Sequence, residues 1–371
     1  MMPKNVLGIV YSNSYDASLG ALTARRTMGS VPFGSRYRLI DFALSNLVNC
    51  GVTKVGVIAN SNFKSLMDHV GSGRPWDLSR KVDGLFILPP YTQSEVKVGN
   101  DRIFELNRIM SFIEQSKQEY VLLTDTNFVS NMDLSDLFKF HTEKNADITL
   151  VYVNGKLPNL SKVMTLGVDE NSKVTSVAVD VKTKSDVNYA TNVIVIRKAL
   201  LERLVGDAGS FSNTSFETDI IQKNVENLNI YGYKAEGWNY TIDSINSYYE
   251  ANMELLKKEA RESLFNKDRP ILTKVRNDMP VTYGIVSNCK NSLVADGCQI
   301  YGTVKNSIIF RGVYVAKGAV VENSILMQDA YVSEDAKLNC VIMDKNSVIT
   351  PKKNLSGDKS YPLVVGKKIV V

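Results

Sequence analysis

The C-terminal part of the chain carries a short repeat that restricts the fold more than any other feature. An asparagine and a small residue, followed by two aliphatic residues, recur at Asn291, Asn306, Asn323 and Asn339. The copies are 15 to 17 residues apart, with glycines such as Gly312 at the turns between them. A repeat of single strands and turns at so short a period is typical of a parallel β-helix, whose stacked coils bury a narrow aliphatic core. The repeat therefore predicts a β-helix domain at this end of the chain.

The first part of the chain has the order of an α/β domain. Residues 6–11 form an apolar run that predicts a buried strand, followed by a helix over residues 38–50 and a second strand over residues 53–59. This order is typical of a parallel sheet, in which ligands bind at the carboxyl ends of the strands. A later strand over residues 120–125 ends in Asp125, so we expect a carboxylate at that edge.

Length, charge and cysteine content exclude several classes of protein. At 371 residues the chain is long enough for two domains. Its net charge of +5 is spread out, without the clustered basic run of a nucleic-acid binder. Four cysteines without CxxC spacing and two histidines make a zinc site unexpected. No stretch approaches the roughly 18 apolar residues of a membrane span, and no signal peptide is evident, so we expect a soluble, cytoplasmic protein.

Two segments of the chain resemble those of a known enzyme family. Residues 23–46, TARRTMGSVPFGSRYRLIDFALSN, resemble the matching segment of ADP-glucose pyrophosphorylases (glucose-1-phosphate adenylyltransferases), and residues 299–327 resemble the left-handed β-helix of those enzymes. The family makes ADP-glucose from ATP and glucose 1-phosphate. The resemblance implies an α/β, Rossmann-like (GT-A-like) nucleotidyltransferase domain with a mostly parallel sheet over residues 1–250, a helical linker over 251–280 and a left-handed parallel β-helix over 281–371.

The chain departs from the family at the loop after the first strand. In the family a glycine-rich GGxGxRL loop wraps the triphosphate, and a lysine–proline pair precedes VPFG. Glycines let backbone N–H groups approach phosphates without a Cβ clash, and the cations stabilise the charge of the transition state. The positions of the loop and of the lysine are here occupied by Asn13, Ser14, Tyr15, Asp16, Ser18 and Met28. We therefore expect a degenerate nucleotide loop with little or no catalytic activity.

Two carboxylates are candidates for holding the Mg²⁺ that the family uses. Asp125 ends its strand as a metal carboxylate does in the family, although it would also suit a cap of the following turn. Within residues 237–252, Thr241 falls at the second metal carboxylate of the family, and Asp243, two positions away, is a weak candidate. The family's GTADA motif keeps only Gly99. Mg²⁺ is therefore expected only if nucleotide binding is retained.

Four arginines, Arg25, Arg26, Arg36 and Arg38, lie around the VPFG segment. Guanidinium groups suit contacts with phosphates and sugar phosphates. A basic residue near Arg25 belongs to the activator site of the family, so Arg25, Arg26 and Arg36 are candidates for effector or phosphate contact. The alternative is that these arginines form surface or intersubunit salt bridges.

The departures extend over the whole catalytic domain, as in the second, D-type subunit found beside the catalytic subunit in glycogen-forming bacteria. That resemblance implies a regulatory subunit of glucose-1-phosphate adenylyltransferase in glycogen biosynthesis, assembled with the catalytic chain into a hetero-oligomer, with a heterotetramer expected. Two alternatives stay open. The chain could be a working adenylyltransferase in which Asp125 and Asp243 hold Mg²⁺. It could also be a binding module whose β-helix serves assembly and whose former active site is empty.

Overall fold

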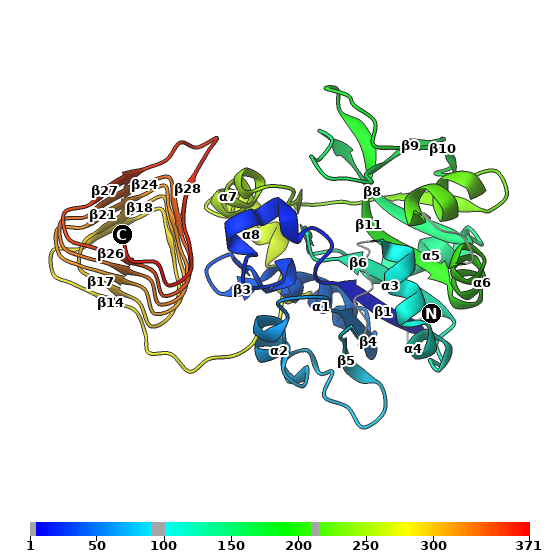
Figure 1. Ribbon diagram of the computed structural model, residues 1–371, viewed down its shortest axis with the longest axis horizontal. Helices are drawn as coiled ribbons and strands as arrows, with labels where there is room; N and C mark the ends of the chain where they lie inside the picture. Colours follow the sequence, from blue (N-terminus) through cyan, green and yellow to red (C-terminus); the bar gives the residue numbers. More distant parts are fainter. Residues whose placement is uncertain (1–4, 91–100, 210–214) are drawn as a thin grey trace.

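The computed structural model describes residues 5–90, 101–209 and 215–371. An α/β domain, drawn in blue to green, lies beside a C-terminal β-helix, drawn in orange to red (Figure 1). Helices near the end of the first domain lie between the two. The fold class predicted from the sequence, a nucleotidyltransferase-like α/β domain followed by a left-handed parallel β-helix, is confirmed.

The central strands of the first domain are parallel. They are β6 (Tyr120–Asp125), β1 (Val6–Tyr11), β4 (Lys54–Ile58) and β5 (Gly84–Leu88), adjacent in that order. Every residue of β1 is buried because packed layers cover both faces of the sheet. The strands predicted over residues 6–11, 53–59 and 120–125 are confirmed.

Beyond β6 the sheet becomes mixed. The long strand β11 (Val187–Arg197) runs antiparallel to β6 and to β8 (Ile148–Gly155). In turn, β8 pairs in parallel with β12 (Ile230–Lys234). A hairpin of β9 (Met164–Val168) and β10 (Val174–Val179) joins β11 through β9. Within the described residues 148–197, no helix lies between β8, β9, β10 and β11 along the chain, so β11 can return antiparallel to β8, whereas α6 (Lys198–Gly209) lies between β11 and β12.

Helices cover the two faces of the sheet and build two separate apolar cores. One face is covered by α1 (Leu39–Asn49), α2 (Lys64–Val70) and α5 (Leu134–Glu143). The other is covered by α3 (Arg102–Arg108), α4 (Met110–Glu114) and α6 (Lys198–Gly209). Shorter pieces are 3₁₀ turns at Asp16–Leu22, Met28–Ser30, Arg74–Trp76 and Gln222–Asn224, a π-helical turn at Phe216–Ile221, and β2 (Pro32–Phe33), β3 (Tyr37–Arg38), β7 (Phe128–Ser130) and β13 (Asn239–Thr241).

The sequence predicts a helical linker over residues 251–280, but the junction contains two short helices followed by non-helical chain over residues 266–280. α7 (Ile245–Glu254) and α8 (Lys258–Leu264) are separated by a turn. The guanidinium of Arg261 donates hydrogen bonds to the carbonyls of Leu255 and Leu256, at 2.9 and 2.7 Å. These bonds satisfy carbonyls that the end of α7 leaves free, so a break is stable here without proline or glycine.

The C-terminal domain consists of three parallel sheets of five strands each, all within residues 281–371. The first contains β14 (Thr282–Tyr283), β17 (Gln299–Ile300), β20 (Tyr314–Val315), β23 (Tyr331–Val332) and β26 (Val348–Ile349). The second contains β15 (Asn288–Lys290), β18 (Thr303–Lys305), β21 (Val320–Glu322), β24 (Lys337–Asn339) and β27 (Asn354–Ser356). The third contains β16 (Leu293–Val294), β19 (Ile308–Ile309), β22 (Ile325–Leu326), β25 (Val341–Met343) and β28 (Leu363–Val365).

The repeated asparagines stack at one corner of the β-helix. Asn291, Asn306 and Asn323 adopt φ near 45°, a left-handed conformation that asparagine tolerates better than most residues. Each side-chain amide donates a hydrogen bond to the next asparagine, from Asn291 to Asn306 at 2.8 Å and from Asn323 to Asn339 at 2.9 Å. The repeat thus reflects a corner conformation as well as a core pattern.

The two domains share one apolar cluster. Phe33 and Tyr248 of the first domain belong to the same buried cluster as Ile308, Phe310 and Met327 of the β-helix. This shared packing fixes the β-helix against the α/β domain. Among the residues that the structure describes, no helix is long and apolar enough to span a membrane.

Candidate functional site

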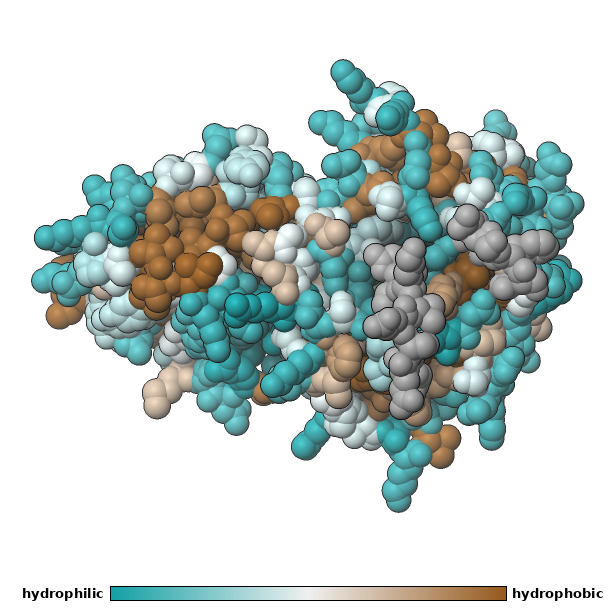
Figure 2. Space-filling model, viewed as in Figure 1, coloured by the Kyte–Doolittle hydropathy of each residue, from teal (hydrophilic) through white to brown (hydrophobic). Residues whose placement is uncertain are grey.

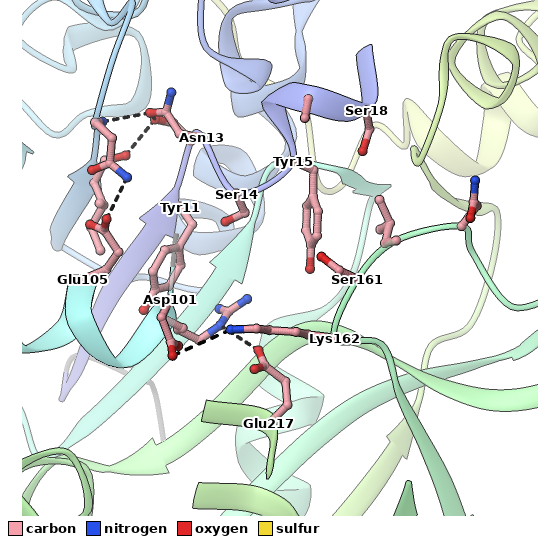
Figure 3. A pocket seen from close by; sticks show the side chains of 17 residues that line it. Tyr11, Asn13, Ser14, Tyr15, Ser18, Asp101, Glu105, Ser161, Lys162 and Glu217 are labelled. Atoms are coloured by element: carbon pink, nitrogen blue, oxygen red, sulfur yellow. Dashed lines mark hydrogen bonds and ion pairs between the residues drawn. The ribbon is translucent and has the colours of Figure 1, made fainter. Parts of the chain in front are cut away.

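A cavity of about 420 Å³ lies at the carboxyl ends of β1 and β4, where a doubly wound sheet places its ligands. Its walls come from the first loop (residues 13–19), the beginning of α3, residues 159–162 and Glu217. Figure 3 shows Tyr11 and Tyr15 pointing from one side of this cavity toward Lys162 and Glu217 on the other. We call it the first pocket.

The first loop is held by its own polar side chains. The carboxylate of Asp16 accepts hydrogen bonds from the backbone N–H of Met28 and from the amide of Asn13, both at 2.6 Å. The side-chain oxygen of Asn13 accepts a further bond from the backbone N–H of Asn60, at 3.0 Å. Burial raises the pKa of Asp16 to about 6, although both hydrogen bonds oppose that shift. Side-chain contacts therefore fill the loop that in the family is left open by glycines.

The other altered positions differ in where their side chains lie. Ser14, Tyr15 and Ser18 line the first pocket. The hydroxyl of Tyr15 accepts a hydrogen bond from the side chain of Asn192 at 2.7 Å, and burial raises the pKa of that tyrosine. Met28 is 1% exposed and belongs to the apolar cluster that joins the two domains. Its side chain is therefore part of the core and not of the pocket wall.

Asp125, the predicted metal carboxylate, is fully buried and paired with an arginine of the same chain. One of its oxygens accepts a hydrogen bond from Nη2 of Arg102 at 2.8 Å, and the other accepts one from the hydroxyl of Ser14 at 3.2 Å. The Nε of Arg102 lies 3.6 Å from a carboxylate oxygen of Glu217, and its guanidinium lies 4.4 Å from the ring centre of Tyr11. Burial alone would lower the pKa of Arg102, but Asp125, Tyr11 and Glu217 together raise it, so the guanidinium stays charged.

The sequence interpretation found Asp125 but missed Arg102, which neutralises it, and the other charged residues of the pocket. Arg102, Glu217 and Lys162 reach the first pocket from three separate segments. The sequence held one signal for Arg102, because this arginine lies in the stretch that corresponds to the family's GTADA motif, which contains no cation.

Asp243 is engaged away from Asp125. One of its oxygens accepts a hydrogen bond from the backbone N–H of Asn159 at 2.7 Å, and the other accepts one from the hydroxyl of Ser244 at 2.8 Å. The neighbouring Thr241 contacts the hydroxyl of Tyr189. Within residues 5–90, 101–209 and 215–371, no three His, Cys, Asp or Glu side chains form a group that could hold a metal ion.

These contacts do not fit the Mg²⁺ that the family implies. Such an ion is usually held by one or two ionised carboxylates together with substrate phosphates. Asp125 already faces a guanidinium, and Asp243 is bound to backbone and hydroxyl groups. The loop that would bring the phosphates is filled by the side chains of Asn13 and Asp16.

The candidate effector arginines have different surroundings. Arg25 is exposed. Arg26 is buried and donates through one nitrogen to both oxygens of Asp344 in the β-helix, at 2.7 Å each. Arg36 pairs with Asp296, and both side chains are 42% exposed. For Arg26 and Arg36 the structure thus shows salt bridges, formed within the chain between its two domains.

A second pocket of about 180 Å³ lies between the two domains and is rich in cations. Its basic lining side chains are Arg36, Arg38, His69, Lys274, Arg276, Arg311 and Lys345, with Asp68 as the acidic one. Burial lowers the pKa of Lys345 well below its ordinary value, and Arg38 and Arg26 add to that effect. The basic groups of this pocket therefore repel one another, and an anionic ligand would relieve that repulsion.

Comparisons with known proteins agree with both domains. Residues 18–258 match the model of the nucleotidyl transferase family, and residues 281–361 match that of the GlmU-like C-terminal hexapeptide family. The chain is 34% identical to the glycogen biosynthesis protein GlgD of Bacillus subtilis over 374 residues, covering 100% of this chain and 98% of the relative. It is also 34% identical to GlgD of Geobacillus stearothermophilus, with the same coverage. Identity to the glucose-1-phosphate adenylyltransferase of Thermosipho africanus is 30% over 325 residues, covering 86% of this chain and 78% of that enzyme.

Proposed function

Because the chain belongs to the nucleotidyl transferase family, with glycogen biosynthesis protein GlgD and glucose-1-phosphate adenylyltransferases among its relatives, we propose that it is a modulatory subunit in glycogen biosynthesis. In this role it assembles in the cytoplasm with a catalytic glucose-1-phosphate adenylyltransferase chain. It adds little or no ADP-glucose synthesis of its own, and it changes the activity or the effector response of its partner.

The ion pair between Arg102 and Asp125 is the observation that carries this proposal. Nucleotidyl transfer depends on positive charge and backbone donors placed around the phosphates. In the first pocket the carboxylate that would help to hold a metal ion is matched by a guanidinium. The cations that the family supplies at the positions of Ser18 and Met28 are absent, and Asp16 adds a carboxylate to the loop. Each missing donor or cation removes roughly 2.7–4 kcal/mol of transition-state stabilisation, so turnover becomes very slow.

An association with a second chain is supported by an apolar surface. Figure 2 shows a continuous apolar area over the β-helix domain. Exposed apolar side chains of its last coil include Leu363, Ile369 and Val370, of which Val370 is 64% exposed. Exposed apolar areas of this kind commonly mark protein–protein contacts. A modulatory role needs only that partner binding favour one of two subunit states by a few kcal/mol.

The second pocket is the proposed effector site. It combines Arg36, one of the three candidate effector arginines, with cations from both domains, so an anionic ligand there would bridge the domain boundary. Arg26 lies beside it as the partner of Asp344, the residue before Lys345. Arg25 is not among the residues that line this pocket.

The test is ADP-glucose synthesis by the purified chain, alone and mixed with a catalytic glucose-1-phosphate adenylyltransferase, over a range of ATP and glucose 1-phosphate concentrations. We expect no measurable synthesis by the chain alone and altered kinetics of the mixture. Synthesis by the chain alone that is lost in Asp125→Asn would establish the active-enzyme alternative. A mixture that behaves as the catalytic chain alone, with no association in sedimentation, would refute the modulatory role.

The same assay tests the effector site. The double variant Arg36→Gln/Arg276→Gln, which removes two cations from the second pocket, should weaken the response of the mixture to phosphate or sugar-phosphate effectors at least tenfold. Arg25→Gln is the matched control, because it removes an exposed cation outside the pocket. If Arg25→Gln alone weakened the response, the effector site would lie on the exposed surface instead.

A further inference from the structure

Arg102 is buried between carboxylates that come from different parts of the chain. It lies at the start of α3, Asp125 ends β6, and Glu217 belongs to the π-helical turn. The side chains of Arg102, Asp125 and Glu217 are each no more than 6% exposed. One guanidinium thus lies within reach of two buried carboxylates, at 2.8 Å from Asp125 and 3.6 Å from Glu217.

The guanidinium is also enclosed on its faces. The ring centre of Tyr11 lies 4.4 Å from the central carbon of the Arg102 guanidinium, and that of Phe216 lies 5.7 Å from it. Aromatic rings at this distance attract a cation and exclude water, so they hold the guanidinium in place. Hydroxyl groups complete the arrangement, since Ser14 donates to Asp125 and Ser215 donates to Glu217 at 2.8 Å.

The carboxylates around Arg102 form the kind of ligand set that takes a divalent cation elsewhere in proteins. Two carboxylates and neutral oxygen donors suit Mg²⁺ and Mn²⁺. The guanidinium of Arg102 supplies positive charge at the same place, but it is part of the chain and cannot dissociate. It carries one positive charge, whereas the metal ion carries two. The two kinds of cation therefore exclude each other.

We propose that Arg102 is a built-in counter-ion that takes the place of a divalent metal beside Asp125 and Glu217, so that the first pocket binds no metal until that guanidinium is removed. This inference deepens the proposed function, with which it shares the pocket, by naming what keeps the site free of metal. Its test measures metal binding and not ADP-glucose synthesis, so it can fail while the modulatory role stands.

A purely structural ion pair would give a different result. If Arg102 only stabilised the fold, its removal would lower stability and leave Mn²⁺ binding unchanged. If it is a counter-ion in the place of a metal, its removal creates a site for Mn²⁺ that depends on Asp125. Mn²⁺ binding is therefore the measurement that separates the two roles.

The experiment titrates the full chain with Mn²⁺ alone and follows free Mn²⁺ by electron paramagnetic resonance. We expect Arg102→Met to bind one Mn²⁺ at least tenfold more tightly than the wild type, and Arg102→Met/Asp125→Asn to lose that binding. Arg102→Lys, which keeps a cation, should behave as the wild type. Arg108→Met is the matched control, because Arg108 is a nearly buried arginine on the same helix that pairs with Glu105 at 2.7 Å instead.

Thermal unfolding gives a second readout. A folded Arg102→Met should melt several degrees below the wild type and regain stability as Mn²⁺ is added, because a ligand that binds only the folded state raises the midpoint. If Arg102→Met is unfolded in metal-free buffer, Mn²⁺ should restore its near-ultraviolet circular dichroism.

Three results would overturn the proposal. One is Mn²⁺ binding by the wild type that Asp125→Asn abolishes, because Arg102 would then not exclude the metal. The others are a folded Arg102→Met that binds Mn²⁺ no more tightly than the wild type does, and an unfolded Arg102→Met that Mn²⁺ does not restore.

Discussion

Asp16 shows how one side chain helps to make the first loop a self-contained structure. Its carboxylate accepts hydrogen bonds from Met28 and Asn13, so the groups that would face a phosphate face a side chain instead. Burial is the larger influence on its pKa, which is raised to about 6. The folded chain therefore holds a proton on Asp16 at pH values where the unfolded chain has released it.

This raised pKa predicts the direction of a pH dependence. The stability that Asp16 contributes is fully present below about pH 4 and is lost as the pH rises through about 6. In Asp16→Asn the position no longer titrates, so the wild type should lose up to about 3 kcal/mol relative to the variant between pH 4 and pH 7. Urea unfolding of both proteins across this range measures the difference.

The control is Asp77→Asn, which alters a carboxylate whose side chain is 87% exposed. Its stability should follow that of the wild type across the same pH range. Parallel stability curves for the wild type and Asp16→Asn would show that Asp16 is not buried as described.

The first pocket also shows which contacts between single residues the sequence alone could not predict. Asp125 could be predicted because it ends an apolar strand, and that position in a sheet faces the ligand edge. The pairing of Arg102 with Asp125 and Glu217 could not, because these residues lie in different elements and local sequence does not reveal which charges meet in the interior. The pairing exists only because the fold brings three distant segments together.

At the scale of elements, the first loop and α3 act on the same pocket from opposite sides. Glycines at positions 13, 14 and 16 would free the backbone N–H groups of the loop, and Ser18→Arg would return a cation to a side chain that lines the pocket. Met28→Lys is less suitable, because Met28 lies in the core and a lysine there would be buried without a partner.

We therefore expect the loop and Arg102 to act jointly on ATP binding. The variant Asn13→Gly/Ser14→Gly/Asp16→Gly/Ser18→Arg should bind ATP with Mg²⁺ only weakly, because Arg102 still occupies the metal position. Adding Arg102→Met should strengthen binding at least tenfold, or about 1.4 kcal/mol, in calorimetric titration. Equal affinities with and without Arg102→Met would show that the loop alone controls access.

Helices and strands were predictable where the sequence pattern that specifies them is local. The Asn-Ser repeat predicted the β-helix because each coil repeats the same corner and core positions. The mixed part of the sheet around β11 was not predicted, since its direction depends on which distant strand it joins. The break between α7 and α8 depends on Arg261 reaching back to two carbonyls, a contact without a periodic signal.

At the scale of the whole molecule, the two domains are joined by a buried ion pair inside a shared apolar cluster. Arg26 and Asp344 are 2% and 1% exposed, and 318 positions separate them in the chain. At the same boundary, Arg36 and Asp296 pair with both side chains 42% exposed. The first pair lies in a low-dielectric interior and the second is screened by water, so the two should differ sharply in their effect.

This difference predicts how the domains separate. Arg26→Met leaves Asp344 buried without a counter-ion and should cost about 3–5 kcal/mol, whereas Arg36→Met should cost about 1 kcal/mol or less. Because the lost energy lies at the domain boundary, Arg26→Met should split a single calorimetric transition into two and expose the extended junction between α8 and β14 to protease.

Arg26→Met/Asp344→Leu removes both charges and should recover most of the stability, since replacing a buried pair by apolar groups is often nearly neutral. If the double variant were as unstable as Arg26→Met alone, the loss would come from packing around Arg26 and not from the uncompensated charge of Asp344.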